Sequence, residues 1–353
     1  MKDARIPFKG GTDLIRIGIL GIGFMGTTHF MAIRNLANAE VGAICTRDER
    51  KLSGDWRHIQ GNFGGGGGVQ DLTGIRTCTD IDEVLGDPDI DLVDVCLPTA
   101  LHHDVVLRAL DAGKHVLVEK PIALGLDEAD RMIARAGETG RTLMVAHVLK
   151  FFPEFAFLKA AIDDGRYGRL LGLHLKRVIS KPLWGEDNWF GDYERTGAAG
   201  IDLHIHDTDY LRYLFGMPDS VHADGMTSPN GYVLYLNTQY GYESRDLTVS
   251  SQCGAISSAA FEHGYDAYFE EGTLWYNVLS DRPVTLYTPD GARTEPEIEF
   301  PEAFEAQLGY AINALENGTE PDLVSAAAAR DALRICHAEA ESVKTGETIR
   351  FSD

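Results

Sequence analysis

The sequence predicts an α/β protein of two domains, in which a doubly wound parallel sheet is followed by an α+β domain with a mostly antiparallel sheet. Its 353 residues correspond to roughly two domains of about 150 residues each. In residues 1–146 short apolar runs alternate with amphipathic helical patterns, which favours βαβ units with right-handed crossovers. The pattern changes near residue 147, so the predicted domains are residues 1–147 and 148–353.

Six apolar runs are the expected strands of the first domain, and helical patterns with three- and four-residue spacing separate several of them. The expected strands are residues 14–20, 41–45, 75–78, 91–97, 115–119 and 142–146, and the expected helices are 25–36, 102–113 and 126–140. The glycine run at 64–68 is too flexible to hold a fixed catalytic group, so we expect a surface loop there.

The second domain begins with a helix, a strand and a further helix, and continues with strands that Gly, Asn and Asp separate. Two helices close the chain, and they can pack back on the first domain. The expected ranges are a helix at 154–164, a strand at 170–179, a helix at 201–215, antiparallel strands within 231–290, and helices at 302–317 and 323–344.

The composition excludes several classes of protein. The 32 basic and 54 acidic residues give a net charge of −22, which argues against a nucleic-acid binder and against a polybasic membrane anchor. No apolar run reaches the length of a transmembrane helix, and the N-terminus lacks the apolar segment of a secretory signal. Five cysteines are scattered without metal-ligand spacing, so we expect a cytoplasmic protein without a metal site.

The segment GIGFMG, after the first strand, has the G-x-G-x-x-G spacing of a dinucleotide-binding turn. Gly21 permits the tight turn, Gly23 lets a pyrophosphate approach the backbone, and Gly26 lets the helix pack on the strand. The helix N-terminus then favours the negative phosphates. We therefore expect cofactor contacts along the turn, which also holds Ile22, Phe24 and Met25, and the alternative is a tight turn without a ligand.

The end of the second strand is where the adenosine ribose is read, often by an acidic residue. Here Thr46 and Arg47 stand before Asp48. A hydroxyl and a guanidinium suit a 2′-phosphate, so NAD(P) is the expected cofactor and NADP is favoured over NAD. The alternative is that Thr46 and Asp48 only cap the next helix.

Polar residues also follow the fourth and fifth strands, whose carboxyl ends border the ligand crevice of such a sheet. Glu119 and Lys120 end the fifth strand and are expected to contact the cofactor, and we expect Lys120 also to donate to a substrate oxygen. The residues expected to border the cofactor after the fourth strand are Pro98, Thr99 and His102. The alternatives are a surface lysine and a histidine that only opens its helix.

The segment DLHIHDTD, residues 202–209, is expected inside one helix. Helical spacing puts Asp202, His206 and Asp209 on one face, and a carboxylate beside an imidazole suits acid/base chemistry. Asp209 is the member expected to be structural. Metal binding is an alternative, but His204 and His206 diverge around a helix; a buried, purely structural histidine is another.

With these motifs the chain resembles the Gfo/Idh/MocA oxidoreductases. The resemblance rests on GIGFMG, on the block IDLVDVCLPTALHHDVVLRALDAGKHVLVEKP, on the Asp-x-x-x-His-x-x-Asp pattern before YLRYLFG, and on the closing GETIRF. It implies a Rossmann domain and a C-terminal α+β domain with a large, open-faced sheet that usually packs against another subunit. It also implies that Lys120 is the motif lysine and that Asp202 and His206 are the catalytic pair. Thr46-Arg47 and Lys150 depart from the common pattern.

The predicted activity is the reversible, NAD(P)-dependent oxidation of a secondary alcohol of a sugar, anhydrosugar or cyclitol. His206 takes the hydroxyl proton, Asp202 orients His206, and Lys120 stabilises the oxyanion. Basic and aromatic residues suit a polyhydroxylated substrate, although the aromatic ones could equally cover a core or interface: Lys150, Arg177 and Trp184, with Lys181, Trp189 and Phe190. The alternative functions are an NAD-dependent glycosidase with transient oxidation and a non-catalytic, cofactor-binding regulator.

The strands within 231–290 predict a homodimer or homotetramer. Apolar residues stand in both alternating sets of these strands, for example Val233, Tyr235, Leu247, Val249, Ile256, Leu274 and Tyr276. A sheet with two apolar faces can bury one against helices and the other against a second copy. The alternative is a monomer whose own loops cover the sheet.

Overall fold

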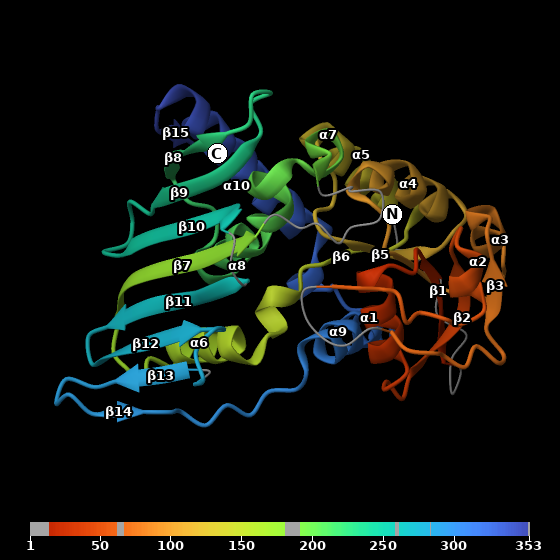
Figure 1. Cartoon of the computed structure of the whole chain (residues 1–353), viewed down its shortest axis with the longest axis horizontal. Helices are drawn as coiled ribbons and strands as arrows, with labels where there is room; N and C mark the ends of the chain where they lie inside the picture. Colours follow the sequence, from red (N-terminus) through yellow and green to blue (C-terminus); the bar gives the residue numbers. More distant parts are fainter. Residues whose placement is uncertain (1–13, 62–66, 181–190, 258–260, 283, 352–353) are drawn as a thin grey trace, which may run out of the picture. The chain divides into compact units, whose positions relative to one another are not determined.

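The computed structural model describes residues 14–61, 67–180, 191–257, 261–282 and 284–351. The chain forms two compact units (Figure 1). Unit 1 consists of residues 1–147 and 303–330, and unit 2 consists of residues 148–302 and 331–353. Within the described ranges, no helix has both the length and the apolar character needed to cross a membrane.

Unit 1 contains the predicted doubly wound sheet, whose six strands are all parallel. Their order is β3-β2-β1-β4-β5-β6, so the strand order reverses between β1 and β4, the position where such sheets bind ligands. The strands are β1 (Ile15–Leu20), β2 (Ala39–Cys45), β3 (Arg76–Cys78), β4 (Leu92–Val95), β5 (His115–Glu119) and β6 (Leu143–Ala146).

Helices cover both faces of this sheet, which is why its strands are almost continuously buried. One face is covered by α4 and α5, and the other by α1 and by α9, which returns from far along the chain to pack on α1 (Figure 1). The helices of this unit are α1 (Phe24–Ile33), α2 (Glu49–Leu52), α3 (Ile81–Leu85), η1 (Thr99–Leu101), α4 (His102–Asp111), α5 (Leu126–Thr139), α9 (Ala303–Asn317) and η5 (Asp322–Val324). The short helices α2 and α3 are additions to the prediction.

Unit 2 is built on a nine-stranded sheet of order β14-β13-β12-β11-β7-β10-β9-β8-β15. The strands are β7 (Leu170–Ser180), β8 (Ser220–Thr227), β9 (Val233–Gly241), β10 (Thr248–Ser257), β11 (Glu262–Phe269), β12 (Gly272–Asn277), β13 (Val284–Tyr287), β14 (Arg293–Thr294) and β15 (Ile349–Arg350). The predicted antiparallel pairing holds except between β10 and β7, which run parallel. Strands β8, β14 and β15 were not predicted.

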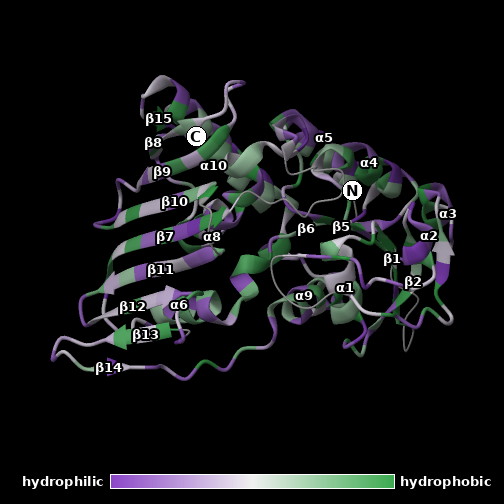
Figure 2. Ribbon diagram, in the orientation of Figure 1, coloured by the Kyte–Doolittle hydropathy of each residue, from purple (hydrophilic) through white to green (hydrophobic). Residues whose placement is uncertain are grey.

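One face of the second sheet carries the core of unit 2. Helices α6 (Pro153–Asp164), α8 (Ile205–Phe215) and α10 (Ala326–Thr345) lie against it (Figure 1), and Phe155 and Tyr210 pack there on Tyr265 of β11. Hydrophobic and hydrophilic residues alternate along these strands, as in a sheet with one covered face (Figure 2). The remaining short helices are η2 (Val148–Phe151), α7 (Tyr193–Thr196) and η4 (Ala199–Leu203).

The opposite face of this sheet corrects the expectation of two apolar faces. Val249 and Leu274 are buried on the core side, whereas Ile256 is exposed. Around the exposed positions lie polar contacts, including an ion pair of 2.9 Å between Lys176 Nζ and Glu262 Oε1. The second face is therefore a mixture of polar, charged and isolated apolar side chains.

Candidate active site

The glycine turn between β1 and α1 has the geometry that a bound pyrophosphate needs. A Cβ added to Gly21 would lie 2.5 Å from the carbonyl oxygen of Cys96, and one added to Gly26 would lie 2.0 Å from that of Gly21. Gly21 also has a φ of +95°. By contrast, a Cβ on Gly23, the N-cap of α1, would meet no atom of the described residues within 4 Å. The turn thus packs tightly on the sheet and leaves open space at the helix N-terminus, so a dinucleotide phosphate fits here.

The other residues of this turn share the cofactor prediction but differ in accessibility. Ile22 is buried in the core, so only its backbone can face a ligand, while Phe24 and Met25 are half-buried. After β4, Thr99 is buried in η1 and Pro98 is half-buried. These positions remain predicted cofactor contacts.

His102 joins the two loops that follow β4 and β5. Its Nδ1 lies 2.9 Å from the carbonyl oxygen of Pro121, and its Nε2 lies 2.8 Å from that of Leu97. The ring is buried, and burial lowers the pKa of His102 below its ordinary value. Because both ring nitrogens face backbone carbonyls, the side chain supports the loops beside Lys120 and opens α4 at the same time.

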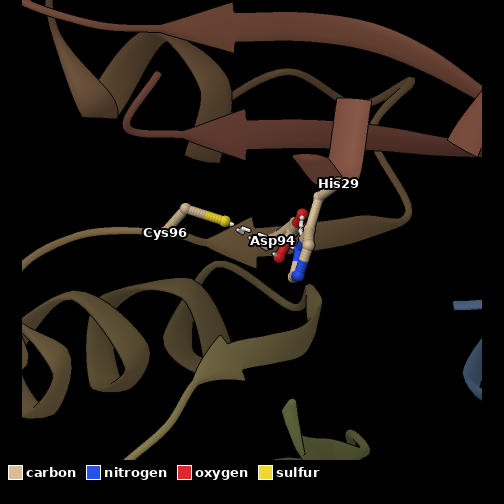
Figure 3. Close-up of side chains that lie close together, drawn as sticks. All are labelled: His29, Asp94 and Cys96. Atoms are coloured by element: carbon tan, nitrogen blue, oxygen red, sulfur yellow. Dashed lines mark hydrogen bonds and ion pairs between the residues drawn. The ribbon is translucent and has the colours of Figure 1, made fainter. Parts of the chain in front are cut away.

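Behind the glycine turn, His29 of α1 lies beside the buried carboxylate of Asp94 and the thiol of Cys96 (Figure 3), and its other ring nitrogen faces the buried carboxylate of Glu119. Its Nδ1 is 2.9 Å from Asp94 Oδ2, and its Nε2 forms an ion pair of 3.1 Å with Glu119 Oε1. Burial is the largest single effect and disfavours the imidazolium, but the charge of Asp94 and the hydrogen bonds to Asp94 and Cys96 together outweigh it and raise the pKa of His29 well above its ordinary value. Glu119 therefore belongs to a buried charged cluster, and its Oε2 accepts the backbone N–H of Lys120 at 3.1 Å.

At the end of β2, Asp48 is the N-cap of α2 and accepts the backbone N–H of Arg50 at 2.9 Å. Its carboxylate also lies 3.3 Å from His58 Nε2. Thr46 is half-buried, and Arg47 is exposed. The capping alternative considered for Asp48 is thus what the structure shows, and Arg47 is left as the accessible charged residue at this strand end.

Asp202 and His206 lie on two different kinds of helix, which corrects the prediction of one continuous helix. Asp202 belongs to the π-helical segment η4, and His206 to the first turn of α8 after a junction at His204. Both side chains are half-buried, whereas Asp209 is buried. Since a π turn contains more residues than an α turn, the i, i+4 spacing does not by itself align the first two residues; such segments are frequent at functional sites.

A buried polar network holds this junction on the sheet. His204 Nε2 lies 3.1 Å from Glu339 Oε1 of α10 and 3.2 Å from the Tyr240 hydroxyl of β9. Burial is the largest single effect and opposes the charge on His204, but the Glu339 carboxylate and the hydrogen bonds to Asp207 and Cys253 together outweigh it and raise the pKa of His204 well above its ordinary value. Asp207, one helical turn after His204, accepts two hydrogen bonds from Arg177 of β7. Arg177 Nε lies 3.0 Å from Asp207 Oδ2, and Arg177 Nη2 lies 2.9 Å from Asp207 Oδ1.

Two predicted substrate-binding residues are instead committed to ion pairs inside unit 2. Lys150 is 7% exposed, and its Nζ lies 2.9 Å from Asp209 Oδ2. Arg177 is 4% exposed and forms the pair with Asp207. Their charges are neutralised and shielded from solvent, so the structure places both in the interior of the unit. The predicted contact Trp184, with Lys181, Trp189 and Phe190, lies outside the described residues.

Sequence reasoning missed His29 and Asp94. Asp94 did give a signal, because it is a carboxylate in the otherwise apolar run DLVDVCL. Among the described residues, two groups have three ligand atoms close enough for a metal: His29, Asp94 and Cys96, and His204, Asp207 and Cys253. In both groups the histidine and the carboxylates already form ion pairs, and burial raises the pKa of each thiol, which favours the protonated form that does not bind metals.

Comparisons with known proteins agree with this geometry. The family model described as "Oxidoreductase family, NAD-binding Rossmann fold" matches residues 15–147, and the "GFO/IDH/MocA C-terminal domain" matches residues 155–275. A scyllo-inositol 2-dehydrogenase (NAD(+)) of Bacillus subtilis is 28% identical over 326 residues, covering 87% of this chain and 88% of that protein. A 1,5-anhydro-D-fructose reductase of Ensifer adhaerens is 28% identical over 70% of this chain and 75% of its own length.

The solved structures include similar folds. The apo scyllo-inositol dehydrogenase from Lactobacillus casei superposes with a TM-score of 0.73 at 19% identity, covering 96% of this chain and 98% of that one. At this identity the likeness concerns the fold.

Proposed function

Because the chain belongs to the Gfo/Idh/MocA family of oxidoreductases, we propose that it reversibly oxidises a secondary alcohol of a sugar, anhydrosugar or cyclitol with a nicotinamide cofactor. One observation carries this proposal. A turn with open space for a pyrophosphate at Gly23 and a lysine at the end of β5 belong to the same parallel sheet, at the carboxyl ends of its strands. The names of two relatives, an inositol dehydrogenase and an anhydrofructose reductase, support the substrate class.

The nicotinamide, when bound, supplies the hydride acceptor. In the proposal Lys120 donates to the substrate oxygen and stabilises the negative charge that develops on it, while His206 takes the hydroxyl proton. Asp202 orients His206 and stabilises its charged form. Support comes from their accessibility, since all three side chains are half-buried rather than sealed in a core.

For the cofactor, we propose a preference for NADP over NAD. The support is that Asp48, the residue able to bond a ribose 2′-hydroxyl, already caps α2 and contacts His58, while Arg47 is exposed after β2. An exposed guanidinium binds a 2′-phosphate strongly. Binding titrations with both cofactors measure this preference directly.

The test of the activity is a panel of sugars, anhydrosugars and cyclitols, followed by NAD(P)H absorbance and by product analysis with both cofactors. Replacing Lys120→Ala should lower turnover by about 10²–10⁴-fold and leave the cofactor Kd within about threefold, because the phosphates are bound at the glycine turn. The matched control is Lys159→Ala, whose side chain pairs with Asp163 on the surface of α6.

Three outcomes would contradict the proposal. Near-normal turnover of the Lys120→Ala variant would remove Lys120 from the mechanism. Cleavage of glycosides without net NAD(P)H formation would identify the glycosidase alternative. Cofactor binding without turnover of any substrate in the panel would favour the non-catalytic regulator.

A further inference from the structure

Acidic and basic residues of unit 1 alternate along a row of spatial neighbours: Asp94, His29, Glu119 and Lys120. Asp94 on β4 contacts His29 on α1 at 2.9 Å, and His29 contacts Glu119 on β5 at 3.1 Å. The next residue after Glu119 is Lys120. Asp94 and His29 have no exposed surface, and Glu119 is 6% exposed. Opposite charges in such a buried series stabilise one another strongly, because little water screens them.

This charged series connects the glycine turn to the lysine through specific atoms. His29 is three residues beyond Gly26 on the helix whose N-terminus faces the open space at Gly23. Glu119 contacts His29 with Oε1 and accepts the Lys120 backbone N–H with Oε2 at 3.1 Å. A shift of α1 therefore moves the carboxylate that holds the Lys120 backbone.

The cluster has no direct access to a substrate, so its influence on the reaction must pass through Lys120. Cys96 Sγ lies 3.6 Å from His29 Nδ1, and the Phe304 ring of α9 lies 6.4 Å from the imidazole between ring centres. The Cys96 thiol is neutral, because burial raises its pKa. His102 lies on the other side of Glu119 and is kept neutral by burial, which lowers its pKa. His29 is thus the cation that neutralises the two carboxylates from within.

We propose that His29 is a positioning residue for Lys120: as an imidazolium shared by Asp94 and Glu119, it fixes the carboxylate that binds the Lys120 backbone and so couples the cofactor-binding turn to the catalytic lysine. The part of this inference that concerns turnover rests on the proposed function. The part that concerns the Lys120 backbone does not.

The pH range over which His29 and Glu119 stay charged follows from the shifted pKa values of these two side chains. The pKa of His29 is raised, so the imidazolium persists at neutral pH and is lost only as the pH rises through that raised value. Burial opposes ionisation of Glu119, but contact with His29 outweighs burial and lowers its pKa, so the carboxylate persists below its ordinary titration range. The coupling is intact between these limits and fails first in alkali as the imidazolium deprotonates.

Hydrogen exchange of the Lys120 amide tests the coupling without any substrate. Pro121 has no amide, so Lys120 is the last exchanging position of this strand end. His29→Gln, which keeps size and polarity but removes the charge, should speed exchange at Lys120 by about tenfold or more. The control is His115→Gln, at the opposite end of β5, where the His115 ring accepts the Thr142 backbone N–H at 3.1 Å. This control should leave exchange at Lys120 unchanged.

In a second experiment, kcat and KM are measured for the same variants, for Glu119→Gln and for the double variant His29→Gln/Glu119→Gln. If His29 acts through Glu119, the double variant should be no slower than the slower single one, and His29→Gln should reduce kcat by about 10–100-fold with a smaller change in KM. The alkaline limit of the kcat profile should disappear in His29→Gln. Additive losses, or equal losses in His115→Gln, would show general destabilisation and overturn the proposal.

If His29→Gln does not fold, the protonation state of His29 in the unaltered protein tests the proposal. In histidine-labelled protein, the ring nitrogens of His29 should both be protonated at pH 7.5 and should shift together only in alkali. A neutral His29 ring at that pH would overturn the proposal. Absence of turnover on every substrate, with the amide and imidazolium signals as expected, would instead refute the proposed function and leave the coupling intact.

Discussion

Arg47 is the residue on which the proposed preference for NADP depends. It is exposed directly after β2, and the neighbouring Asp48 carboxylate is committed to the N-terminus of α2. Arg47→Ala should raise the Kd for NADP by about 10–100-fold, the worth of a hydrogen bond to a charged group, and leave the Kd for NAD within about twofold. Arg57→Ala, which removes an exposed partner of Asp55, is the control. Equal weakening of both cofactors would refute the preference.

Lys150 is predicted to stabilise unit 2 through its ion pair with Asp209. Both side chains are almost fully buried, so Lys150→Met removes the buried cation that faces the Asp209 carboxylate and should lower the free energy of unfolding by about 3–5 kcal/mol. The double variant Lys150→Met/Asp209→Leu should recover most of that loss. In denaturant titrations, the exposed pair of Lys159 and Asp163 is the comparison, and its removal should change stability by only about 0.5 kcal/mol. A loss in the double variant as large as in the single one would contradict the assignment.

Partners of this kind could not be predicted from spacing. His29 and Asp94 are 65 positions apart, Lys150 and Asp209 59, and His204 and Glu339 135. The sequence shows that a carboxylate stands in an apolar run, as Asp94 does, but not which cation neutralises it. Residues whose role depends on backbone geometry alone, such as Gly21 and Gly26, were assigned correctly, because adjacent residues determine a turn.

At the scale of elements, substitutions in the glycine turn should distinguish effects on stability from effects on cofactor affinity. Gly23→Ala adds a methyl group where no atom of the described part of the chain lies within 4 Å, so the melting temperature should change by no more than about 2 °C. The same methyl group would occupy the pyrophosphate position and should weaken cofactor binding by at least about tenfold. Gly26→Ala is the matched comparison: its methyl group would meet the Gly21 carbonyl oxygen, so the protein should lose stability as well. Unchanged cofactor affinity in Gly23→Ala would exclude this turn as the phosphate site.

The π-to-α junction that carries Asp202 and His206 is predicted to depend on the His204–Glu339 ion pair. The pKa of His204 is raised in the folded protein, so the pair stabilises fully below the unfolded value of about 6.5 and is lost as the pH rises through the raised pKa. Glu339→Gln should therefore lower the free energy of unfolding by about 3 kcal/mol near pH 6 and by progressively less in alkali. Denaturant titrations across pH measure this, and a difference independent of pH would contradict it.

Strands and helices were predicted correctly where one hydrophobic period holds along the whole segment. The apolar runs of unit 1 became strands because both faces of its sheet are covered, and β5 has the predicted bounds. The helix expected over 201–215 begins instead as the π segment η4. A uniform period of 3.6 residues predicts an α-helix along the whole segment, so it does not reveal the π turn. Strand β8 was missed because only Val221 and Ala223 of its eight residues are buried, so its alternation is weak.

At the scale of the whole molecule, the helices that the structure describes in unit 2 cover one face of its nine-stranded sheet, and we predict that a second copy of the chain covers the other face. The core side is sealed by α6, α8 and α10. On the other side Met226, Ile256 and Tyr268 are 56%, 48% and 49% exposed. Between these apolar residues lie polar ones such as Lys176 and Glu262, which suits the mixed composition of interfaces between subunits.

Light scattering at micromolar concentration and moderate salt should return a dimer or tetramer. Ile256→Glu/Tyr268→Glu places two carboxylates on the open face and should shift the mass to the monomer, because each new charge would have to be desolvated in the contact between the two copies. Val69→Glu, at an exposed position of unit 1, introduces the same charge elsewhere and should leave the mass unchanged. A monomer mass for the unaltered protein would refute the prediction. An oligomer that survives the double substitution would place the interface on another surface, since a symmetric contact through this sheet brings the same two residues in from both copies.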